Sequence, residues 1–424
     1  MERMIVEGIG NTRRLLIVGL AFTAIMLNYV DRQIIALLKP MLQSEFGWSD
    51  RDYSHMASAF QFSAAVAFLG TGWFIDRIGL RRGFAIGVGA WSLAGMAHAF
   101  VTSVGGFVGV RAALGAAESI GTPAQVKTAA TYFPPEQRSL MLGVGNMASN
   151  FGAVVAPLTI PALALALGWR AAFLIAGGLG LVWVLAWFAV TPRTSKTPGA
   201  AGSADGDRGA SVPWSSLLRD RRQWAVIAAK ALSDQVWWFL LFFMPDLFHR
   251  MFGMSQGSLG LPIATIYFLA ALGSLSGGIL PTYLLRRGVD VNRARKGSML
   301  LYALLILPVP LVLLTGDPWV AAGLLGLGLF AHQGFSTNVF AMTADIFPSR
   351  MIGTAIGIGA FAGNLSGMGM IELAGWSLDN GHGYTPMLLI CGGSYLVALL
   401  LIHLLVPKLV VAEPGTAKVA RAGH

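Results

Sequence analysis

The chain has 424 residues, of which 55% are hydrophobic and 12% are charged, whereas about 25% of the residues of a soluble domain are charged. This composition excludes an ordinary soluble protein and predicts an integral membrane protein. The net charge of +10 does not indicate nucleic-acid binding, because the basic residues fall in short clusters between apolar runs. The single cysteine, Cys391, excludes an intrachain disulfide and a cysteine metal site, and we expect no metal and no cofactor.

Twelve apolar segments have about the 20 residues that a helix needs to cross a bilayer. They lie near residues 14–38, 53–75, 83–103, 106–132, 140–162, 168–191, 223–248, 258–285, 297–315, 318–346, 351–376 and 384–406. Because each segment must satisfy its own backbone hydrogen bonds in lipid, we expect an all-α membrane protein with twelve transmembrane helices. The first segment is too long for a signal sequence and has no small-residue cleavage site, so we interpret it as a retained anchor.

Ionisable residues interrupt these segments away from the predicted helix ends. Each costs about 2.5 to 3.5 kcal/mol in a membrane helix on insertion scales. On the first helix, Tyr29 and Arg32 share a face, whereas Asp31 points about 100° away from Arg32. On the fourth helix, Arg111 and Glu118 share a face about 10 Å apart along the axis, which leaves room for something between them. The other two such residues are Lys230 and Asp234.

The charges of the first half balance, because Asp31 and Glu118 offset Arg32 and Arg111. An anion that docks on an arginine adds a negative charge, and protonation of either acid removes it. We therefore predict that an anion and a proton travel together. The alternative is that the four residues form ion pairs between helices that hold the bundle together. The planar fork of arginine favours the first interpretation, since it suits the bidentate capture of a carboxylate.

The loop after the second predicted helix reads GWFIDRIGLRR, residues 72–82. It combines an acid, a glycine turn and a basic cluster, and its counterpart in the second half, GGILPTYLLRR, has Thr282 in place of the acid. The spacing resembles the signature of the major facilitator superfamily, in which this loop latches the two halves on the cytoplasmic side. The resemblance implies a gating loop made of Gly72, Asp76, Arg77, Gly79 and Arg81. An ordinary loop of the positive-inside kind is the alternative.

Residues 191–213 are rich in Gly, Ala, Ser, Pro and charge, which predicts a flexible linker. On either side the sequence repeats itself at a shift of 214 residues, so that Phe133-Pro134 matches Phe347-Pro348. The repeat predicts two six-helix pseudo-repeats, with a substrate site between them and rocking of one half against the other. The predicted units are a bundle at 1–191, a linker at 192–222, a second bundle at 223–407 and a tail at 408–424.

Several polar residues of the second half are open to two interpretations. Lys230 and Asp234 are four residues apart and are expected to pair along one helix face, either as part of the site or for structure alone. Trp238 fits a sugar pocket or an interfacial anchor. His332 matches Glu118 under the 214-residue shift and is either a proton carrier or a satisfied polar residue. Two amides, Asn150 and Asn364, suit sugar hydroxyls or helix packing.

The sidedness follows from lysine and arginine. Most of these residues fall in the loops on the side of the N-terminus, whereas the opposite loops and helix ends hold only Lys39, Arg51, Arg170 and Arg250. The positive-inside rule therefore predicts a multi-pass protein of the inner (plasma) membrane with both termini in the cytoplasm.

The stretch RAALGAAE at 111–118, with YFPPEQR at 132–138 and NYVDR at 28–32, resembles the anion:cation symporter family. KALSDQVWWF at 230–239 and GVDVNRARK at 288–296 resemble its hexuronate transporter branch. The resemblance implies a proton-coupled importer of a hexuronate such as galacturonate or glucuronate. It assigns anion binding to Arg32 and Arg111 and proton coupling to Asp31 and Glu118. We add Tyr29, Asn150, Trp238 and Asn364 as candidate substrate-binding residues.

Other functions remain as alternatives. FAGNLSG at 361–367 resembles the galactonate and glucarate branches, so the sugar acid stays open, and a drug exporter of the same fold is a further rival. The sequence has no phosphate-binding G-x-x-x-x-G-K-[ST] loop and no catalytic constellation, so we expect neither a primary pump nor an enzyme. The expected partners are a small organic anion, protons and the lipid bilayer, without nucleic acid, and we expect a monomer.

Overall fold

The structure is a computed structural model that describes residues 10–133, 135–192 and 214–409. Helices make up all the regular structure of these residues. The α-helices are α2 (Asn11–Phe46), α3 (Asp50–Ile78), α4 (Leu80–Ala97), α5 (Val104–Glu118), α6 (Gly121–Tyr132), α7 (Pro135–Leu167), α8 (Trp169–Val190), α9 (Trp214–Leu218), α10 (Arg221–Phe252), α11 (Gly260–Arg286), α12 (Val291–Leu305), α13 (Pro318–Ile346), α14 (Ser349–Asp379) and α15 (Thr385–Leu405). Two short 3-10 helices, η1 (His98–Phe100) and η2 (Val309–Leu314), follow α4 and α12. The all-α prediction is confirmed.

Each of the twelve predicted segments coincides with helix, but only ten described spans are long and apolar enough to cross a membrane. The segment at 106–132 is two helices, because the ring of Pro123 would clash with the carbonyl of Ser119, four residues earlier, in one continuous helix. The segment at 318–346 is the single helix α13, in which His332 and Gln333 lower the mean hydropathy. The prediction of twelve spans is therefore supported for ten segments.

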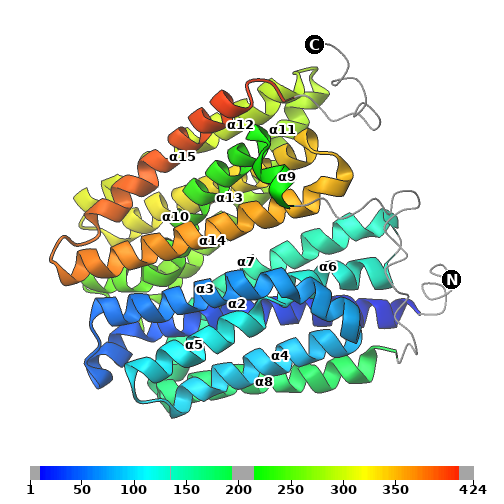
Figure 1. The fold of residues 1–424 in the computed structure, drawn as a ribbon. Coiled ribbons are helices and arrows are strands. Elements are labelled where there is room, and N and C mark those ends of the chain that lie inside the picture. The colour runs from blue at the N-terminus through cyan, green and yellow to red at the C-terminus, as the bar shows by residue number, and fades with distance from the viewer. Residues whose placement is uncertain (1–9, 134, 193–213, 410–424) are drawn as a thin grey trace.

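The helices gather in two groups, α2 to α8 and α10 to α15, which lie one above the other in Figure 1. We call the end where α2 begins and α15 ends the terminal end, and the opposite end the far end. The basic loop residues of the sequence, such as Arg82 and Arg287, lie at the terminal end, since they stand at the start of α4 and just after α11. Which end faces the cytoplasm stays a prediction.

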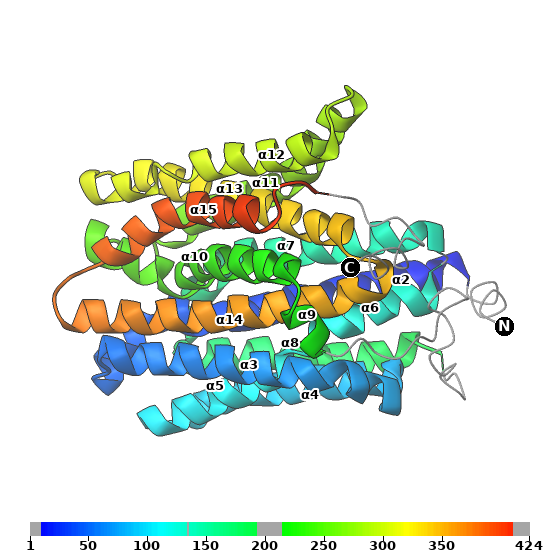
Figure 2. The same ribbon diagram turned by 45° about the horizontal axis from the view of Figure 1, so that its top comes forward.

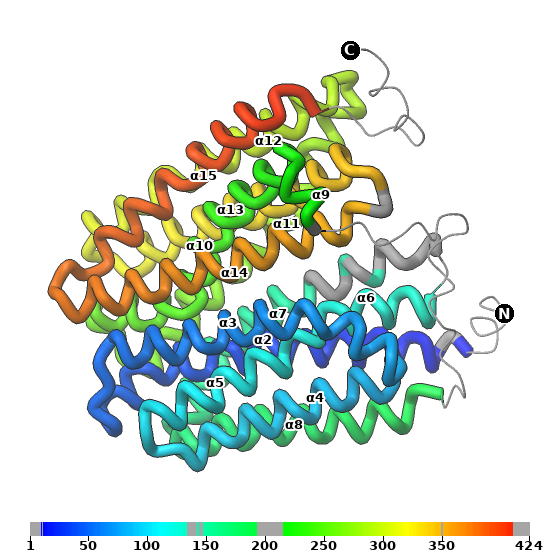
Figure 3. The backbone as a smooth tube through the Cα atoms, in the orientation of Figure 1, coloured from blue at the N-terminus to red at the C-terminus, as the bar shows by residue number. Residues whose placement is uncertain are grey.

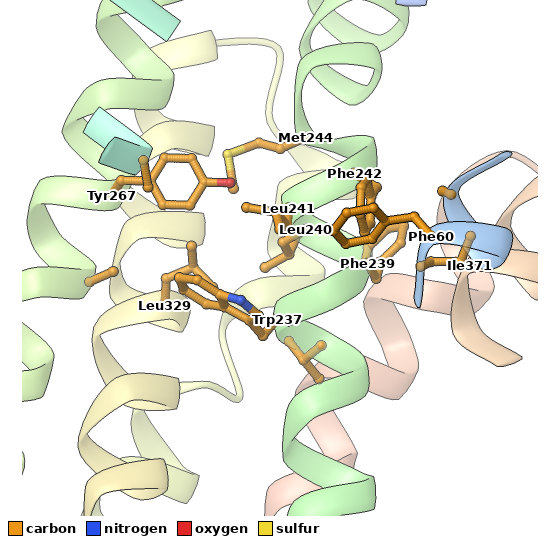
Figure 4. Close-up of a cluster of buried hydrophobic side chains, with 14 of the residues drawn as sticks. Phe60, Trp237, Phe239, Leu240, Leu241, Phe242, Met244, Tyr267, Leu329 and Ile371 are labelled. Atoms are coloured by element: carbon orange, nitrogen blue, oxygen red, sulfur yellow. The ribbon is translucent and has the colours of Figure 1, made fainter. Parts of the chain in front are cut away.

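The two groups contact each other through α3 and α14, α2 and α10, and α7 and α11. Figure 2 shows α3 and α14 side by side. Tyr53 of α3 donates a hydrogen bond of 2.6 Å to the carbonyl of Phe242 in α10. Figure 4 shows Phe60 of α3 pointing at Phe242, and their ring centroids are 6.1 Å apart. Aromatic side chains of α3 therefore join the two groups, from Tyr53 near the far end to Phe60 about two turns further along α3.

Towards the terminal end the two groups diverge, as the backbone traces in Figures 1 and 3 show. A groove of about 320 Å³ lies there between α3 and α14. It is lined by Ala65, Phe68, Leu69, Gly353, Thr354, Gly357, Ala360, Phe361 and Asn364. The conformation is thus closed at the far end and parted at the terminal end.

The repeat detected in the sequence has matching backbone geometry. Phe133 ends α6 with φ −126° and ψ 142°, and Phe347 ends α13 with φ −114° and ψ 144°. Both residues turn the chain into the next long helix, α7 or α14. Of the predicted linker, residues 193–213 lie outside the described residues, and α9 and the start of α10 occupy its last part.

Candidate functional site

Arg32 lies at the contact between the two helix groups. Its Nε donates to the Glu118 carboxylate of α5 at 2.7 Å, and the two side chains are 14% and 0% exposed. Its guanidinium carbon is 4.8 Å from the ring centroid of Tyr29 and 5.8 Å from that of Trp238. Trp238 belongs to α10, so the arginine is flanked by aromatic rings from both halves. This ion pair is the centre of the candidate site.

Arg111 lies directly behind this pair. It is fully buried, donates a hydrogen bond of 3.3 Å to the backbone carbonyl of Arg32, and holds its guanidinium carbon 4.9 Å from the ring centroid of Phe60. Its Nε and Nη1 have no hydrogen-bond partner among the described atoms, and neither does Oε1 of Glu118. The predicted second anion-binding arginine is thus covered in this conformation and holds the backbone of the first.

Asp31 is buried at 3% exposure and lies close enough to Glu118 and Arg111 to interact electrostatically with both. The structure therefore brings together all four ionisable residues predicted in the first half. Only one direct ion pair forms among them, between Arg32 and Glu118. It joins two helices, so the arrangement also agrees with the alternative of ion pairs that hold the bundle.

The two predicted amides belong to two other long helices, α7 and α14. Asn150 of α7 is buried. Two positions further on the same helix, a Cβ placed on Gly152 would lie 3.0 Å from Cβ of Tyr29, so this glycine permits the close approach of α7 to α2. Asn364 of α14 donates to the carbonyl of Ala360 at 2.9 Å and borders the groove at the terminal end.

Gln61 of α3 was not predicted from the sequence. It is 1% exposed, and its Nε2 lies 3.4 Å from Oδ1 of Asn364 in the other half. Asn364 already uses its amide nitrogen as a donor, which identifies its oxygen as the acceptor that faces Gln61. A single glutamine inside an apolar helix gave no periodic signal that would separate it from a packing residue.

Lys230 and Asp234 of α10 form the expected pair, with Nζ and Oδ2 2.8 Å apart. Three glycines of α14 pack on α10 at four-residue intervals. Cβ atoms added to Gly359, Gly363 and Gly367 would lie 3.2, 2.4 and 2.4 Å from the nearest atoms of Lys230, Asp234 and Trp238. The lack of side chains on α14 therefore lets the two helices pack closely at the site.

His332 belongs to a separate buried cluster. Its Nδ1 is 2.6 Å from the hydroxyl of Tyr395, which donates to the carbonyl of Ser233 at 3.2 Å. Its ring stacks on Trp237 with centroids 5.3 Å apart. These contacts give Nδ1 of His332 a partner within the second half, and the choice between a proton carrier and a satisfied polar residue stays open.

The residues of the predicted gating loop lie at the terminal end, where α3 ends and α4 begins. The carboxylate of Asp76 pairs with the ammonium of Lys127 in α6 of the same half. Arg81 donates to the carbonyl of Phe188 at 2.8 Å and so ties α4 to the end of α8. Gly79 joins α3 to α4 with φ +89°, a conformation that side chains disfavour. Gly72 and Arg77 are exposed, and the guanidinium of Arg77 lies over Trp73.

A family model described as Major Facilitator Superfamily matches residues 21–371. The chain belongs to this superfamily. A bacterial homologue of the human lysosomal transporter Spinster, solved in an inward-facing and unoccupied conformation, has a TM-score of 0.73 with 18% identity and covers 94% of this chain and 96% of its own. The predicted fold family is therefore confirmed.

The curated relatives are transporters of sugar acids by name. A D-galactonate transporter of Escherichia coli O6:H1 is 28% identical over 93% of this chain and 96% of its own length. A hexuronate transporter of Escherichia coli K12 is 27% identical over 87% of this chain and 88% of its own. A galacturonate transporter of Dickeya chrysanthemi is 28% identical over 72% and 92%. The predicted resemblance to hexuronate transporters is confirmed, and galactonate transporters are equally similar.

Proposed function

We propose that the protein is a secondary transporter that imports a sugar-acid anion with protons by alternating access around Arg32. A hexuronate such as galacturonate or glucuronate is the proposed substrate, with galactonate or glucarate as the alternative. The observation that carries the proposal is the pairing of Arg32 with Glu118, at 2.7 Å, next to Trp238 of the other half. The names of the relatives support the same substrate class.

The ion pair explains why anion and proton would bind together. A substrate carboxylate competes with Glu118 for the guanidinium of Arg32, because both are acceptors for the same donors. Protonation of Glu118 removes its charge and frees the arginine for the substrate. Since Glu118 is fully buried, its charged form is costly once Arg32 turns to another carboxylate. Proton uptake and anion binding therefore favour each other.

The charges next to the Arg32–Glu118 pair determine how many protons we expect to bind with each substrate anion. Asp31 and Arg111 are both buried beside the pair, so the empty site is neutral when all four groups are ionised. A bound monoanion leaves one excess negative charge, which one proton on Glu118 or Asp31 cancels. Arg111 supports this step by fixing the backbone of Arg32.

The remaining side chains of the candidate site suit a substrate that carries several hydroxyl groups. Trp238 and Tyr29 provide apolar ring faces near Arg32, and Asn150 and Asn364 provide amides on α7 and α14. Pockets for small molecules combine apolar and aromatic side chains with a few polar groups that fix the orientation of the ligand. We assign these residues to substrate binding.

We further propose that the terminal end faces the cytoplasm of a bacterial inner membrane, because the Lys and Arg clusters of the loops lie there. The groove between α3 and α14 then opens to the cytoplasm. We propose that the protein acts as a monomer, since one chain contains both halves and the complete site.

Uptake by proteoliposomes tests the proposal. Purified protein is reconstituted with the outside acidified, and labelled galacturonate, glucuronate, galactonate and glucarate are offered in turn. Accumulation of at least one of them, abolished when a protonophore collapses the gradient, is the expected result. Uptake of none of the four, together with efflux of lipophilic cations, would instead identify a drug exporter of the same fold.

A further inference from the structure

Four charged side chains meet at the far end, where α2, α3 and α10 come together. Lys39 of α2 lies 2.8 Å from a carboxylate oxygen of Asp50 in α3 and 3.0 Å from one of Asp246 in α10. Arg250 of α10 lies 2.6 Å from Asp50 and 2.9 Å from Asp246. We call these residues the four-charge cluster. The side chains of Lys39, Asp246 and Asp50 are 0%, 1% and 8% exposed, so these three charges are buried, whereas Arg250 is 38% exposed and reaches the surface.

The four contacts are of two kinds. Lys39 with Asp50 and Asp246 with Arg250 are pairs within one half, whereas Lys39 with Asp246 and Asp50 with Arg250 cross between the halves. Positive and negative groups therefore alternate around a ring. Each half contributes one cation and one anion to the ring, so the charges that each half contributes sum to zero.

Further groups hold the ring in place. Tyr384, the residue just before α15, donates its hydroxyl to Asp246. The ammonium of Lys39 lies 4.8 Å from the ring centroid of Tyr53 and 5.1 Å from that of Phe243. Beside the ring, Asp379 at the end of α14 accepts hydrogen bonds from the first backbone N–H groups of α3. Residues of both halves thus satisfy the buried charges.

We propose that the four-charge cluster is the gate at the far end of the transport path, and that it opens by giving up its two cross-half pairs while each half keeps its internal pair. A buried ion is costly when it loses its only partner. A gate built from cross-half pairs alone would leave unpaired charges on both sides when it opened. Here Lys39 stays with Asp50 and Asp246 stays with Arg250, so opening leaves no ion without a partner.

The same helices connect the gate to the site. Arg32 and Lys39 are seven residues apart on α2, which is about two turns. Trp238 and Asp246 are eight residues apart on α10. A shift of α2 against α10 therefore changes the Arg32 site and the gate together. The inference requires that the two halves move against each other, but it does not depend on which anion is carried.

Variants in which the four charges are exchanged between positions distinguish this gate from a simple attraction between the two halves. The variant Asp50→Arg with Arg250→Asp keeps two cross-half attractions but gives each half two like charges, so we expect it to stay closed. The variant Lys39→Asp with Asp50→Lys keeps the internal pairs but makes both cross-half contacts repulsive, so we expect it to open. Adding Asp246→Lys and Arg250→Asp to the second variant restores the alternating ring and is expected to restore the wild-type state.

The readout is the distance between spin labels at Ser44 and Ser258, two exposed residues at the far end, on a Cys391→Ser background without substrate. We expect a single short distance in the first variant, a longer one in the second and the wild-type distribution in the fourfold variant. Monodisperse elution of each variant from a sizing column controls for folding. If the second variant does not fold, Lys39→Met with Asp50→Asn replaces it and is also expected to lengthen the distance.

The proposal is overturned if the second variant, or its neutral replacement, keeps the wild-type distance. It is also overturned if the first variant opens as readily as the wild type, or if the fourfold variant fails to return to the wild-type distribution. Because the measurement uses no substrate, a failure of sugar-acid uptake leaves its outcome unchanged, and the two proposals fail separately.

Discussion

Arg32 is the residue on which the site depends, because its guanidinium faces Glu118 and aromatic rings of both halves. We expect Arg32→Lys to weaken substrate binding about ten- to hundredfold, since the lost charge-assisted hydrogen bond is worth about 1.5 to 3 kcal/mol. The dissociation constant of the sugar acid, measured by calorimetry on purified protein, checks this. Arg170→Lys, at an exposed arginine of the far end, is the matched control and should bind normally. Wild-type affinity in Arg32→Lys would remove this residue from the anion site.

At the same scale, the sequence predicted the charges inside the apolar segments of the first half but not the four-charge cluster. The reason is physical. A segment that is predicted from its apolar residues ends where charged residues begin, so the first segment was predicted to end at residue 38. The helix α2 continues to Phe46. Lys39 was counted as an end residue of the helix, yet it is fully buried because Asp50 and Asp246 neutralise it. Partners that are far apart in the sequence are invisible to a local pattern.

Among the elements, α10 and α14 depend on the glycines between them. Gly363→Ala places a methyl group about 3 Å from Cβ of Asp234, and we expect a loss of about 1 to 3 kcal/mol from overpacking. Gly369 of the same helix has open space around it, so Gly369→Ala should be neutral or gain up to about 1 kcal/mol of helix propensity. Thermal unfolding of both variants in detergent measures the difference. Equal midpoints would show that the close packing of α10 and α14 is not needed for stability.

The elements also show what hydropathy alone leaves out. The segments predicted from apolar length are mostly helical, because the backbone in lipid has few other options. Their breaks follow from single residues, such as Pro123 in the first turn of α6 and Pro308 between α12 and η2. A window of about 20 residues averages over such a residue. The pairing of Arg32 with Glu118 likewise depends on how α2 packs on α5, which no local pattern records.

At the scale of the whole molecule, we expect the predicted gating loop to stabilise the conformation in which the terminal end is closed. In this conformation Asp76 pairs with Lys127 of its own half. In the opposite conformation, which is open at the far end and closed at the terminal end, we expect Asp76 to form contacts that are absent here. Asp76→Asn should weaken those contacts and shift the population towards the conformation described here. Spin labels at Arg82 and Arg287, exposed at the terminal end, should then report a larger share of long distances. An unchanged distribution would assign Asp76 to local structure only.

The coupling of proton and anion belongs to the transport cycle as a whole, and variants that fix the protonated charge of an acid test it. Glu118→Gln or Asp31→Asn should abolish accumulation driven by a pH gradient but spare the exchange of labelled for unlabelled substrate. Exchange survives because it never requires the return of an empty, deprotonated carrier. Both effects are expected in the same proteoliposomes, which also shows that the variants are folded.

The most direct test of the account is therefore one paired measurement on Glu118→Gln, with gradient-driven accumulation and exchange of the same labelled sugar acid recorded side by side. We predict background accumulation together with exchange near the wild-type rate. If Glu118→Gln, and likewise Asp31→Asn, still concentrates the sugar acid when the outside is acidified, neither buried acid carries the obligatory proton. The pairing of Arg32 with Glu118 would then serve only to hold α2 against α5.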